Sequence, residues 1–455
     1  MSEPRPTHAL DRLANLGARE HSHEASMSMP DGSPTGQMIA SIVLPGAACM
    51  GRRPLLGFVM VVVGVMAPVG LAVWAYLNID DLVGFALDPT FLNTVILVGL
   101  ALLVVRFIAV AEVAHTFRRS PGIGARTLVM TVLLLGLSVP VVYAATKANQ
   151  ARSMVADVFA EGDGESLFVP DFPTVDPAQV TNVLLLGGDA GPGRWGERTD
   201  SMIVVSIDKE TGRTALVSVP RNLTRLMFPP GTPMADEFPN GFSDLANAVF
   251  TYVSGRPALV EHYGRSGLQP EPVALAQGIG YSLGIEIDDY ALVNMQGFAE
   301  VIDAVGGVTL DLTQTVPLPQ DVGDVPLEVG PGMVAMDGPT AIAYARSRAA
   351  DSDYQRMGRQ RQLLSALGSQ VSAGEALSGF GAVTGALQDT MRTSLSSGEF
   401  SALLTRLGDN SSIGESIGLA PPLVQPGSPD YVEIQGIIDA VERYVVTGTH
   451  SGYAS

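Results

Sequence analysis

Five arginines stand close together between residues 344 and 364, in a chain whose formal net charge at pH 7 is -19. They are Arg346, Arg348, Arg356, Arg359 and Arg361. Arginine binds phosphate oxygens through a planar, bidentate fork, so such a group suits a phosphate or pyrophosphate ligand. A salt-bridge network with the nearby Asp351 and Asp353 is the structural alternative, and spacing alone favours neither interpretation.

Two further segments carry charged residues at the ends of apolar runs. Asp189 follows the run "NVLLLGG", and Arg198 and Asp200 follow the Gly-rich and Pro-rich stretch after it. Arg221 ends the apolar segment "ALVSVPR". Strand ends and helix N-termini are where α/β folds bind polar ligands. Two carboxylates with several arginines suit a divalent cation and a phosphate group, because Mg²⁺ prefers carboxylate and phosphate oxygens.

The arginine-rich stretch 344–364 also contains a signal for a helix. Ser352 and Gln355 have the spacing of a capping box, which predicts a helix that begins near Asp353. On that helix Arg356 and Gln360 lie four residues apart and point the same way. Arg359 lies off that face.

Three long apolar runs, Leu55–Leu77, Phe91–Ala111 and Thr127–Thr146, predict transmembrane helices. Each has about the 20 residues that a helix needs to cross the hydrocarbon core. We therefore expect a membrane region over 36–148, preceded by a disordered tail over 1–35. The shorter run Met38–Met50 contains a proline and is expected to be an interfacial or re-entrant segment.

Loop charges predict the orientation of these spans. Basic and acidic loops alternate along the region, with Arg52 and Arg53, then Asp80, Asp81 and Asp88, then Arg118, Arg119 and Arg126. Since Arg and Lys are enriched in cytoplasmic loops, the N-terminus should be cytoplasmic. The three spans then make a multi-pass protein of the cell membrane, with everything after about residue 148 outside.

The rest of the chain predicts a soluble α/β domain over 181–446, after a Pro-rich linker over 149–180 and before a flexible tail over 447–455. Residues 201–222 are typical of a β-hairpin whose turn lies at Asp208–Gly212. Residues 297–312 indicate a helix, a Gly-Gly stop and a strand.

Composition and motifs exclude several other classes of protein. The acidic balance argues against nucleic acid as a partner, because nucleic-acid binding needs a broad positive surface. The single cysteine, Cys49, excludes an intrachain disulfide. The histidines have no zinc-ligand spacing, and no Gly-x-Ser-x-Gly motif of an α/β-hydrolase is present.

Six segments, in order, resemble the LytR-CpsA-Psr family of bacterial cell-wall glycopolymer ligases over roughly residues 181–373. They are "NVLLLGGDA", "ERTDSMIVVSID", "ALVSVPRN", "GFAEVIDAVGGVTLDL", "MDGPTAIAYARSR" and "DSDYQRMGRQRQLL". The resemblance implies an extracytoplasmic α/β domain, with a central β-sheet flanked by helices and an apolar groove for a lipid. It implies a membrane-anchored phosphotransferase that moves a glycopolymer from a polyprenyl-pyrophosphate carrier to a muramic acid hydroxyl of peptidoglycan, forming a phosphodiester.

The resemblance also implies roles for individual residues. Asp189 and Asp200 would hold Mg²⁺, or Mn²⁺, on the pyrophosphate. The residues that would act on or bind the pyrophosphate are Arg198, Arg221, Arg346 and Arg348, with Arg356 and Gln360 completing the same wall.

The chain departs from the family pattern at two points, and two other functions stay open. Asn222 stands where the family often has an aspartate, and the family usually has one membrane span rather than three. The same residues would serve a polyprenyl-pyrophosphate pyrophosphatase, in which water replaces the sugar acceptor. A non-catalytic protein that binds or regulates the wall polymer is the second alternative.

Overall fold

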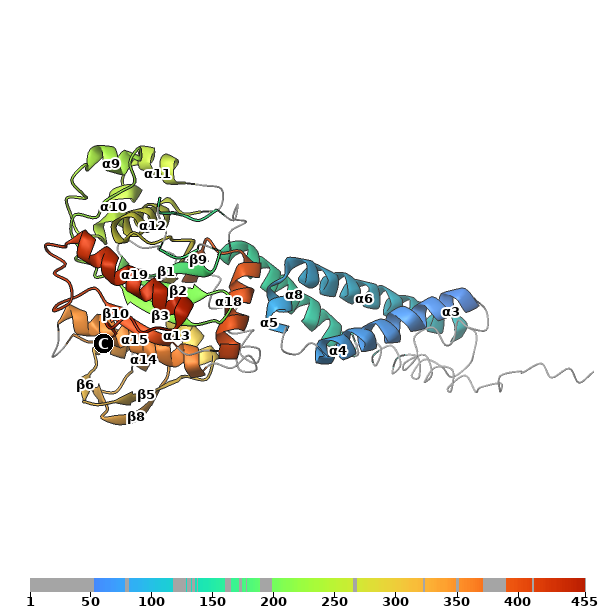
Figure 1. Cartoon of the computed structure of the whole chain (residues 1–455). Helices are drawn as coiled ribbons and strands as arrows, with labels where there is room; N and C mark the ends of the chain where they lie inside the picture. Colours follow the sequence, from blue (N-terminus) through green and yellow to red (C-terminus); the bar gives the residue numbers. More distant parts are fainter. Residues whose placement is uncertain are drawn as a thin grey trace, which may run out of the picture. The chain divides into compact units, whose positions relative to one another are not determined.

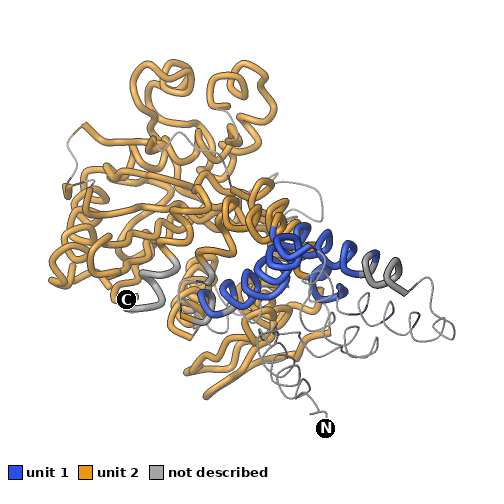
Figure 2. The backbone as a smooth tube through the Cα atoms, turned by 90° about the vertical axis from the view of Figure 1, so that its right-hand side faces the viewer, with its two compact units in different colours: residues 1–74, 98–143 blue, residues 75–97, 144–455 orange. Residues whose placement is uncertain are grey.

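The computed structural model describes residues 53–77, 82–117, 128, 132, 136, 138–159, 165–171, 174–176, 178–188, 199–264, 268–321, 324–348, 352–370, 390–410 and 413–454. The chain divides into two compact units. The first consists of residues 1–74 and 98–143, and the second of residues 75–97 and 144–455 (Figure 2). The predicted tail 1–35 and the Met38–Met50 segment lie outside the described residues.

Two apolar helical stretches, Pro54–Leu71 and Pro89–Ala109, are long enough to cross a membrane. The first belongs to α3 (Pro54–Val61), a π-helical turn η1 (Val62–Met66) and α4 (Ala67–Leu77), and the second to α6 (Pro89–Phe117). Large apolar side chains on both are exposed, for example Phe58 at 60% and Phe107 at 76%. Exposed apolar surface of this kind suits lipid or a partner. These stretches coincide with the first two predicted spans.

The third predicted span, Thr127–Thr146, lies only partly within the described residues and stays a prediction. Its described end belongs to α8 (Val139–Val158), which continues into the segment expected to be a linker. Buried Ala151, Met154, Val155 and Val158 of α8 pack in one cluster with Val183 of the sheet. The first part of the predicted linker is therefore a helix of the second unit, because its apolar residues recur at helical spacing.

A six-stranded mixed sheet in the order β10-β3-β2-β1-β4-β9 forms the centre of the second unit (Figure 1). The strands are β1 (Val180–Gly188), β2 (Thr199–Asp208), β3 (Thr214–Ser218), β4 (Asp289–Asn294), β9 (Met391–Thr393) and β10 (Ile413–Gly418). β2 pairs antiparallel with both β1 and β3, whereas β4 runs parallel to β1 and β10 runs parallel to β3. The α/β sheet flanked by helices agrees with the predicted fold.

Successive side chains along the strands point to opposite faces of this sheet, and each face packs in its own hydrophobic cluster. Leu184 of β1 and Val204 of β2 pack with the helices of one layer, and Val183 and Ile207 pack with those of the other. The first layer contains α10 (Ala248–Ser254), α12 (Pro270–Leu283) and α19 (Tyr431–Thr447), with α9 (Pro233–Glu237) and α11 (Pro257–Tyr263) beside them in Figure 1. The second contains α8, α5 (Leu82–Leu87) and α18 (Ser397–Asn410).

A third cluster supports a smaller layer that carries the arginine-rich stretch. It joins α13 (Met295–Ala304), α14 (Gly338–Arg346) and α15 (Asp353–Gln370) to two short sheets. These sheets pair β5 (Val308–Leu312) with β8 (Gly332–Met336), and β6 (Val316–Pro317) with β7 (Glu328–Val329). Buried Ile302, Val308, Tyr344 and Leu363 tie the helices to the strands.

Three predicted elements are present: the hairpin over 201–222, the helix and strand over 297–312, and the helix that begins near Asp353. Asp208 Oδ1 accepts hydrogen bonds from the backbone of Glu210 and Thr211, and Gly212 has a φ of +70°, which glycine adopts without strain. α13 ends before Gly306 and Gly307, and β5 follows. α15 begins at Asp353, as expected.

The C-terminal segment is bound to the domain, although a flexible tail from 447 was expected. The Ser451 amide donates to Glu415 Oε1 over 2.7 Å, and the His450 ring stacks on Tyr444 with centroids 5.3 Å apart. Glu415 is a buried acceptor on the edge strand β10, so the segment supplies hydrogen-bond donors that the sheet lacks there.

The buried Glu442 of α19 predicts a pH-dependent stability of the second unit. The pKa of its carboxyl is raised to about 8, mainly by burial and further by the charges of Asp439 and Glu286. A hydrogen bond from Asn182 lowers the pKa by a smaller amount. The folded pKa exceeds the unfolded one, so the stabilising contribution is fully present below pH 4.5 and is lost as pH rises through about 8. Glu442→Gln should raise the thermal midpoint at pH 8 and leave it nearly unchanged at pH 4.5.

The measurement is thermal unfolding of the full chain in detergent at several pH values. Glu433→Gln, a change at an exposed glutamate of the same helix, is the control and should leave the midpoint unchanged. A Glu442→Gln midpoint that tracks the parent at every pH would contradict the prediction.

Candidate active site

The β2–β3 hairpin brings Asp200 and Arg221 together at one edge of the sheet. Asp200 is the second residue of β2, and Arg221 lies just beyond the end of β3. In an antiparallel pair the start of one strand lies beside the end of the next, and Ile203 pairs with Ser218 here. Asp200 Oδ1 lies 2.7 Å from Arg221 Nη1 as a result.

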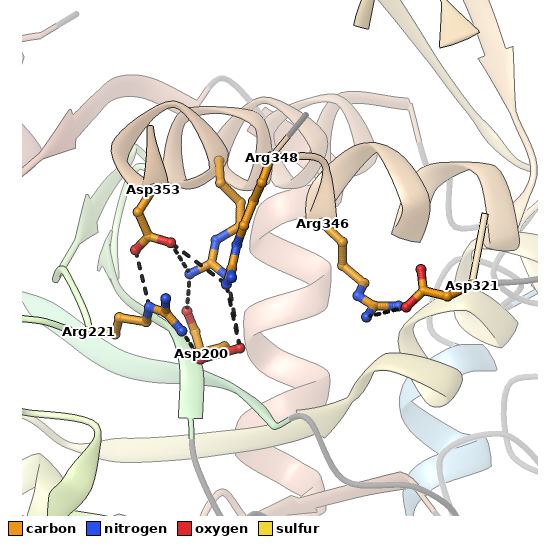
Figure 3. A network of polar contacts seen from close by, with 7 residues as sticks. Asp200, Arg221, Asp321, Arg346, Arg348 and Asp353 are labelled. Carbon is orange, nitrogen blue, oxygen red and sulfur yellow. Dashed lines mark hydrogen bonds and ion pairs between the residues drawn. The ribbon is translucent and has the colours of Figure 1, made fainter. Parts of the chain in front are cut away.

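The end of α14 and the start of α15 bring the other charged groups to the same place. α14 ends at Arg346, Arg348 follows it, and Asp353 is the first residue of α15. Arg356 comes one turn later on the Asp353 face, so a carboxylate and a guanidinium on one helix can both reach the hairpin. Figure 3 shows Asp353 and Arg348 converging on Asp200 and Arg221.

Two carboxylates and three guanidinium groups form one network at this point, which we call the carboxylate–arginine cluster (Asp200, Arg221, Arg348, Asp353 and Arg356). Asp353 Oδ2 lies 3.2 Å from Arg221 Nε, and Asp353 Oδ1 lies 3.0 Å from Arg356 Nη2. Arg348 Nη2 lies 3.8 Å from Asp353 and 4.0 Å from Asp200. Arg356 Nη1 lies 3.8 Å from Asp200, so each carboxylate faces all three arginines.

Arg356 is the most deeply buried member of the cluster, with a side chain only 4% exposed. Burial lowers the pKa of its guanidinium, and Arg348 lowers it further, whereas Asp353 and Asp200 raise it. Nη2 also donates to the backbone oxygen of Asp200 over 3.2 Å. For Arg221, burial lowers the pKa, but the hydrogen bond and charge of Asp200 and those of Asp353 outweigh burial, and the pKa is raised.

Arg346 has a different partner from the other arginines. Its Nη2 lies 3.0 Å from Asp321 Oδ2, and Figure 3 shows the pair apart from the cluster. Asp321 follows β6, and its side chain is 63% exposed. A pair this open to solvent contributes only about 0–1 kcal/mol, so a stronger ligand for Arg346 could displace Asp321.

A cavity of about 600 Å³ runs from these charges into the domain. Polar groups at the cavity come from Asp200, Arg346, Arg348, Arg356, Gln360 and Asp321. Apolar side chains of β1, β2, β4, α13, α14 and α15 make most of the remaining wall, among them Leu185, Ile203, Val293, Phe298, Ile342 and Leu364. The site is thus an apolar groove with a positive end, which suits an amphipathic ligand with an anionic head.

The structure brings together most of the residues that the sequence predicted for this site. Asp200, Arg346, Arg348, Arg356 and Gln360 line the cavity, and Arg356 and Gln360 share a helix face as their spacing indicated. Arg221 joins the carboxylate–arginine cluster without lining the cavity. The predicted residues Asp189 and Arg198 lie outside the described residues.

Asp353 and Asp321 were missed as functional residues. Asp353 was considered only as a salt-bridge partner, yet it contacts the same three arginines as Asp200. Its position in the first turn of α15, three residues before Arg356, was the available signal. Asn222 donates to the Tyr354 hydroxyl over 3.2 Å, so its amide supports the start of α15 rather than the cluster itself.

A double-mutant cycle should detect the link between Asp353 and Arg221. Both side chains are less than a third exposed, so Asp353→Ala and Arg221→Ala should show a coupling in unfolding free energy of about 0.5–1 kcal/mol. The coupling energy should decrease in 1 M salt, because the Debye length falls to about 3 Å and charges then interact more weakly. Denaturant unfolding measures it, and strictly additive single changes would contradict the network.

The sequence of the chain matches the family model described as the LytR_cpsA_psr family over residues 142–416. Among curated proteins, biofilm regulatory protein A of Streptococcus mutans is 26% identical over 60% of this chain and 64% of its own length. The polyisoprenyl-teichoic acid–peptidoglycan teichoic acid transferase TagU of Oceanobacillus iheyensis is 29% identical, over 50% of this chain and 62% of its own. The probable cell wall biosynthesis protein LcpB of Corynebacterium glutamicum is 30% identical, over 56% and 53%.

These matches span between about half and two thirds of the length of each relative. Solved structures match as well. Protein gbs0355 of Streptococcus agalactiae is 21% identical with a TM-score of 0.44, covering 60% of this chain and 90% of its own. TagV of Bacillus subtilis is 22% identical with a TM-score of 0.43, covering 61% and 99%. Because the family model covers more than half of the 455 residues, the chain belongs to the LytR-CpsA-Psr family.

Proposed function

We propose that this protein is a membrane-anchored phosphotransferase that moves a glycopolymer from a polyprenyl-pyrophosphate carrier to peptidoglycan and leaves a phosphodiester link. Membership of the family and the transferase names of relatives such as TagU support this reaction class. The two apolar helical stretches support a membrane anchor. Together with the loop charges, the third predicted span, Thr127–Thr146, would make the anchor multi-pass and place the domain outside the cell.

The observation that carries the proposal is the amphipathic cavity. Its apolar wall, which includes Val293, Phe298 and Leu364, offers a polyprenyl chain a surface that it prefers to water. Its charged end presents guanidinium groups at the point where the pyrophosphate head would lie. A water-soluble phosphate ester would need the arginines but would have no use for the apolar groove.

The charge balance of the site also favours an anionic head group. In the carboxylate–arginine cluster three guanidinium groups face two carboxylates, an excess of one positive charge. Arg346 adds another cation once it leaves the exposed Asp321. A pyrophosphate diester has two negative charges, so it suits a site whose side chains carry an excess of positive charge.

The donor set of the site fits Mg²⁺ or Mn²⁺. Asp200 Oδ2 lies 4.0 Å from Arg348 Nη2 and 3.8 Å from Arg356 Nη1, both longer than a hydrogen bond, so these two arginines leave room for a cation at this oxygen. Protein sites often hold Mg²⁺ through one or two carboxylates together with phosphate oxygens and water. Among the described residues no cluster of three metal-binding side chains is present. Asp200 would hold the ion with Asp189, and the ion would supply charge neutralisation at the phosphate oxygens.

The chemical step exchanges one P–O bond for another. The acceptor hydroxyl oxygen attacks the phosphorus next to the glycopolymer, and the bond from that phosphorus to the bridging oxygen breaks. The electron pair leaves with the polyprenyl phosphate, and the hydroxyl proton passes to a base. Arg346, Arg348 and Arg356 border the place where negative charge grows on the phosphates, and their guanidinium groups would stabilise that charge.

The test uses the full chain in detergent with a short lipid-pyrophosphate glycan, peptidoglycan oligomers and Mg²⁺. Mass spectrometry should find a phosphodiester-linked product that disappears with EDTA. Asp200→Ala and Arg346→Ala should each slow transfer at least about a hundredfold, as expected for loss of a charged group at the reacting phosphate. Asp311→Ala, an exposed change on β5 outside the cavity, is the control.

The alternatives give different products in the same experiment. Release of inorganic phosphate or free glycan phosphate without linkage would indicate a pyrophosphatase. Lipid binding without turnover would indicate a binding or regulatory protein. Full transfer by the Asp200→Ala and Arg346→Ala variants would contradict the assigned site.

The apolar wall can be tested separately from the charged end. Leu364 is half-buried in the cavity wall on α15. Leu364→Glu should raise the KM for a long-chain lipid substrate about tenfold, because a charge in this wall would have to be desolvated. Binding of inorganic pyrophosphate should not change. Leu364→Met, which conserves volume and polarity, is the matched control, and equal KM values for both variants would argue against a tail in this groove.

A further inference from the structure

Ser347 separates the two cavity arginines, Arg346 and Arg348, and its backbone sends them in different directions. α14 ends before it, and Ser347 is extended with φ -54° and ψ 132°. Arg346 accordingly pairs with Asp321, whereas Arg348 approaches Asp200 and Asp353 (Figure 3). The orientation of a single peptide therefore sets the spread between two guanidinium groups.

This peptide is buried and held from two sides. Ser347 is 2% exposed, and its Oγ donates to the Pro317 carbonyl at the end of β6 over 2.5 Å. Its own carbonyl oxygen accepts a hydrogen bond from Arg359 Nη2 of α15. The two bonds fix Ser347 between the small β6–β7 sheet and α15, so the backbone of neither arginine can shift without breaking one of them.

Arg359 is not placed to bind a ligand in the cavity. Its side chain is 6% exposed, and it does not belong to the cavity wall, whereas Arg356 and Gln360 do. The next buried arginine of α15, Arg361, is 8% exposed and donates to Ser416 Oγ of β10 over 2.8 Å. The two arginines are thus similarly buried, but Arg359 donates to the Ser347 backbone and Arg361 donates to the Ser416 side chain.

We propose that Arg359 is a positioning residue. It holds the Ser347 peptide in the orientation in which Arg346 and Arg348 can bind one pyrophosphate from two sides. The inference rests on the proposed function, because it assigns Arg359 a part in binding the same ligand. A charged donor on a backbone carbonyl makes a stronger hydrogen bond than a neutral one, which suits a residue that must keep a peptide fixed. Arg359 acts on the ligand only through the two neighbouring arginines.

The experiment measures binding of geranyl pyrophosphate to the full chain in detergent by calorimetry. Arg359→Gln should raise the Kd about tenfold, and Arg359→Lys, which keeps a charged donor, should recover about half of that loss on a logarithmic scale. Arg361→Gln is the matched control, with a similar loss of thermal stability and a Kd within about twofold of the parent. Ser347→Ala removes only the bond to Pro317 and should raise the Kd about threefold.

A cycle with the two cavity arginines separates positioning from a general structural effect. In a background of Arg346→Ala and Arg348→Ala, Arg359→Gln should cause no further loss of binding, because it acts through groups that are already absent. The same tenfold loss in both backgrounds would overturn the inference, as would unchanged binding by Arg359→Gln in the parent. If Arg359→Gln does not fold, unchanged binding by Ser347→Ala overturns it instead.

The failure of the inference and that of the proposed function look different. A parent that transfers glycopolymer, beside an Arg359→Gln variant that binds geranyl pyrophosphate equally well, overturns the role of Arg359 alone. A parent that neither binds geranyl pyrophosphate nor transfers glycopolymer overturns the proposed function and this inference together.

Discussion

The charge on Arg356 is the constraint on which the site depends. Its side chain is 4% exposed, and a buried guanidinium is stable only where carboxylates balance it. Asp200 and Asp353 supply that balance from two separate parts of the fold, the start of β2 and the start of α15. The need to balance Arg356 therefore fixes the distance between the central sheet and α15, and the cavity lies in the space between them.

The two ends of the cavity follow from different features of the fold. The apolar wall consists of side chains from one face of β1, β2 and β4 together with facing side chains of α13–α15. The charged end lies where β2 begins, α14 ends and α15 starts, so its polar groups need no place in the hydrophobic clusters. Removing water from the groove strengthens the interactions at the charged end, because charges interact more strongly at lower dielectric constant. A lipid tail would thus reinforce the binding of its own head group.

Local patterns in the sequence predicted the elements well, and tertiary pairings less well. The turn at Asp208–Gly212, the Gly-Gly stop after α13 and the start of α15 are determined by neighbouring residues, and each is present. Residues 149–158 were predicted as part of a linker because of the prolines that follow them, whereas the structure has them in a helix. The pairing of Arg346 with Asp321 depends on how β6 meets α14, and no local pattern reports that contact. The shared role of Asp353 likewise depends on distances between segments far apart in the chain.

The most direct test of the account is to locate the lipid in the protein. A polyprenyl pyrophosphate with a diazirine in its tail would be irradiated with the full chain in detergent, and the labelled peptides identified by mass spectrometry. We expect labels on the cavity wall, at peptides containing Val293, Phe298 and Leu364, which excess unlabelled lipid removes. Labels confined to the apolar helices at 54–71 and 89–109, with none in the cavity, would contradict the account.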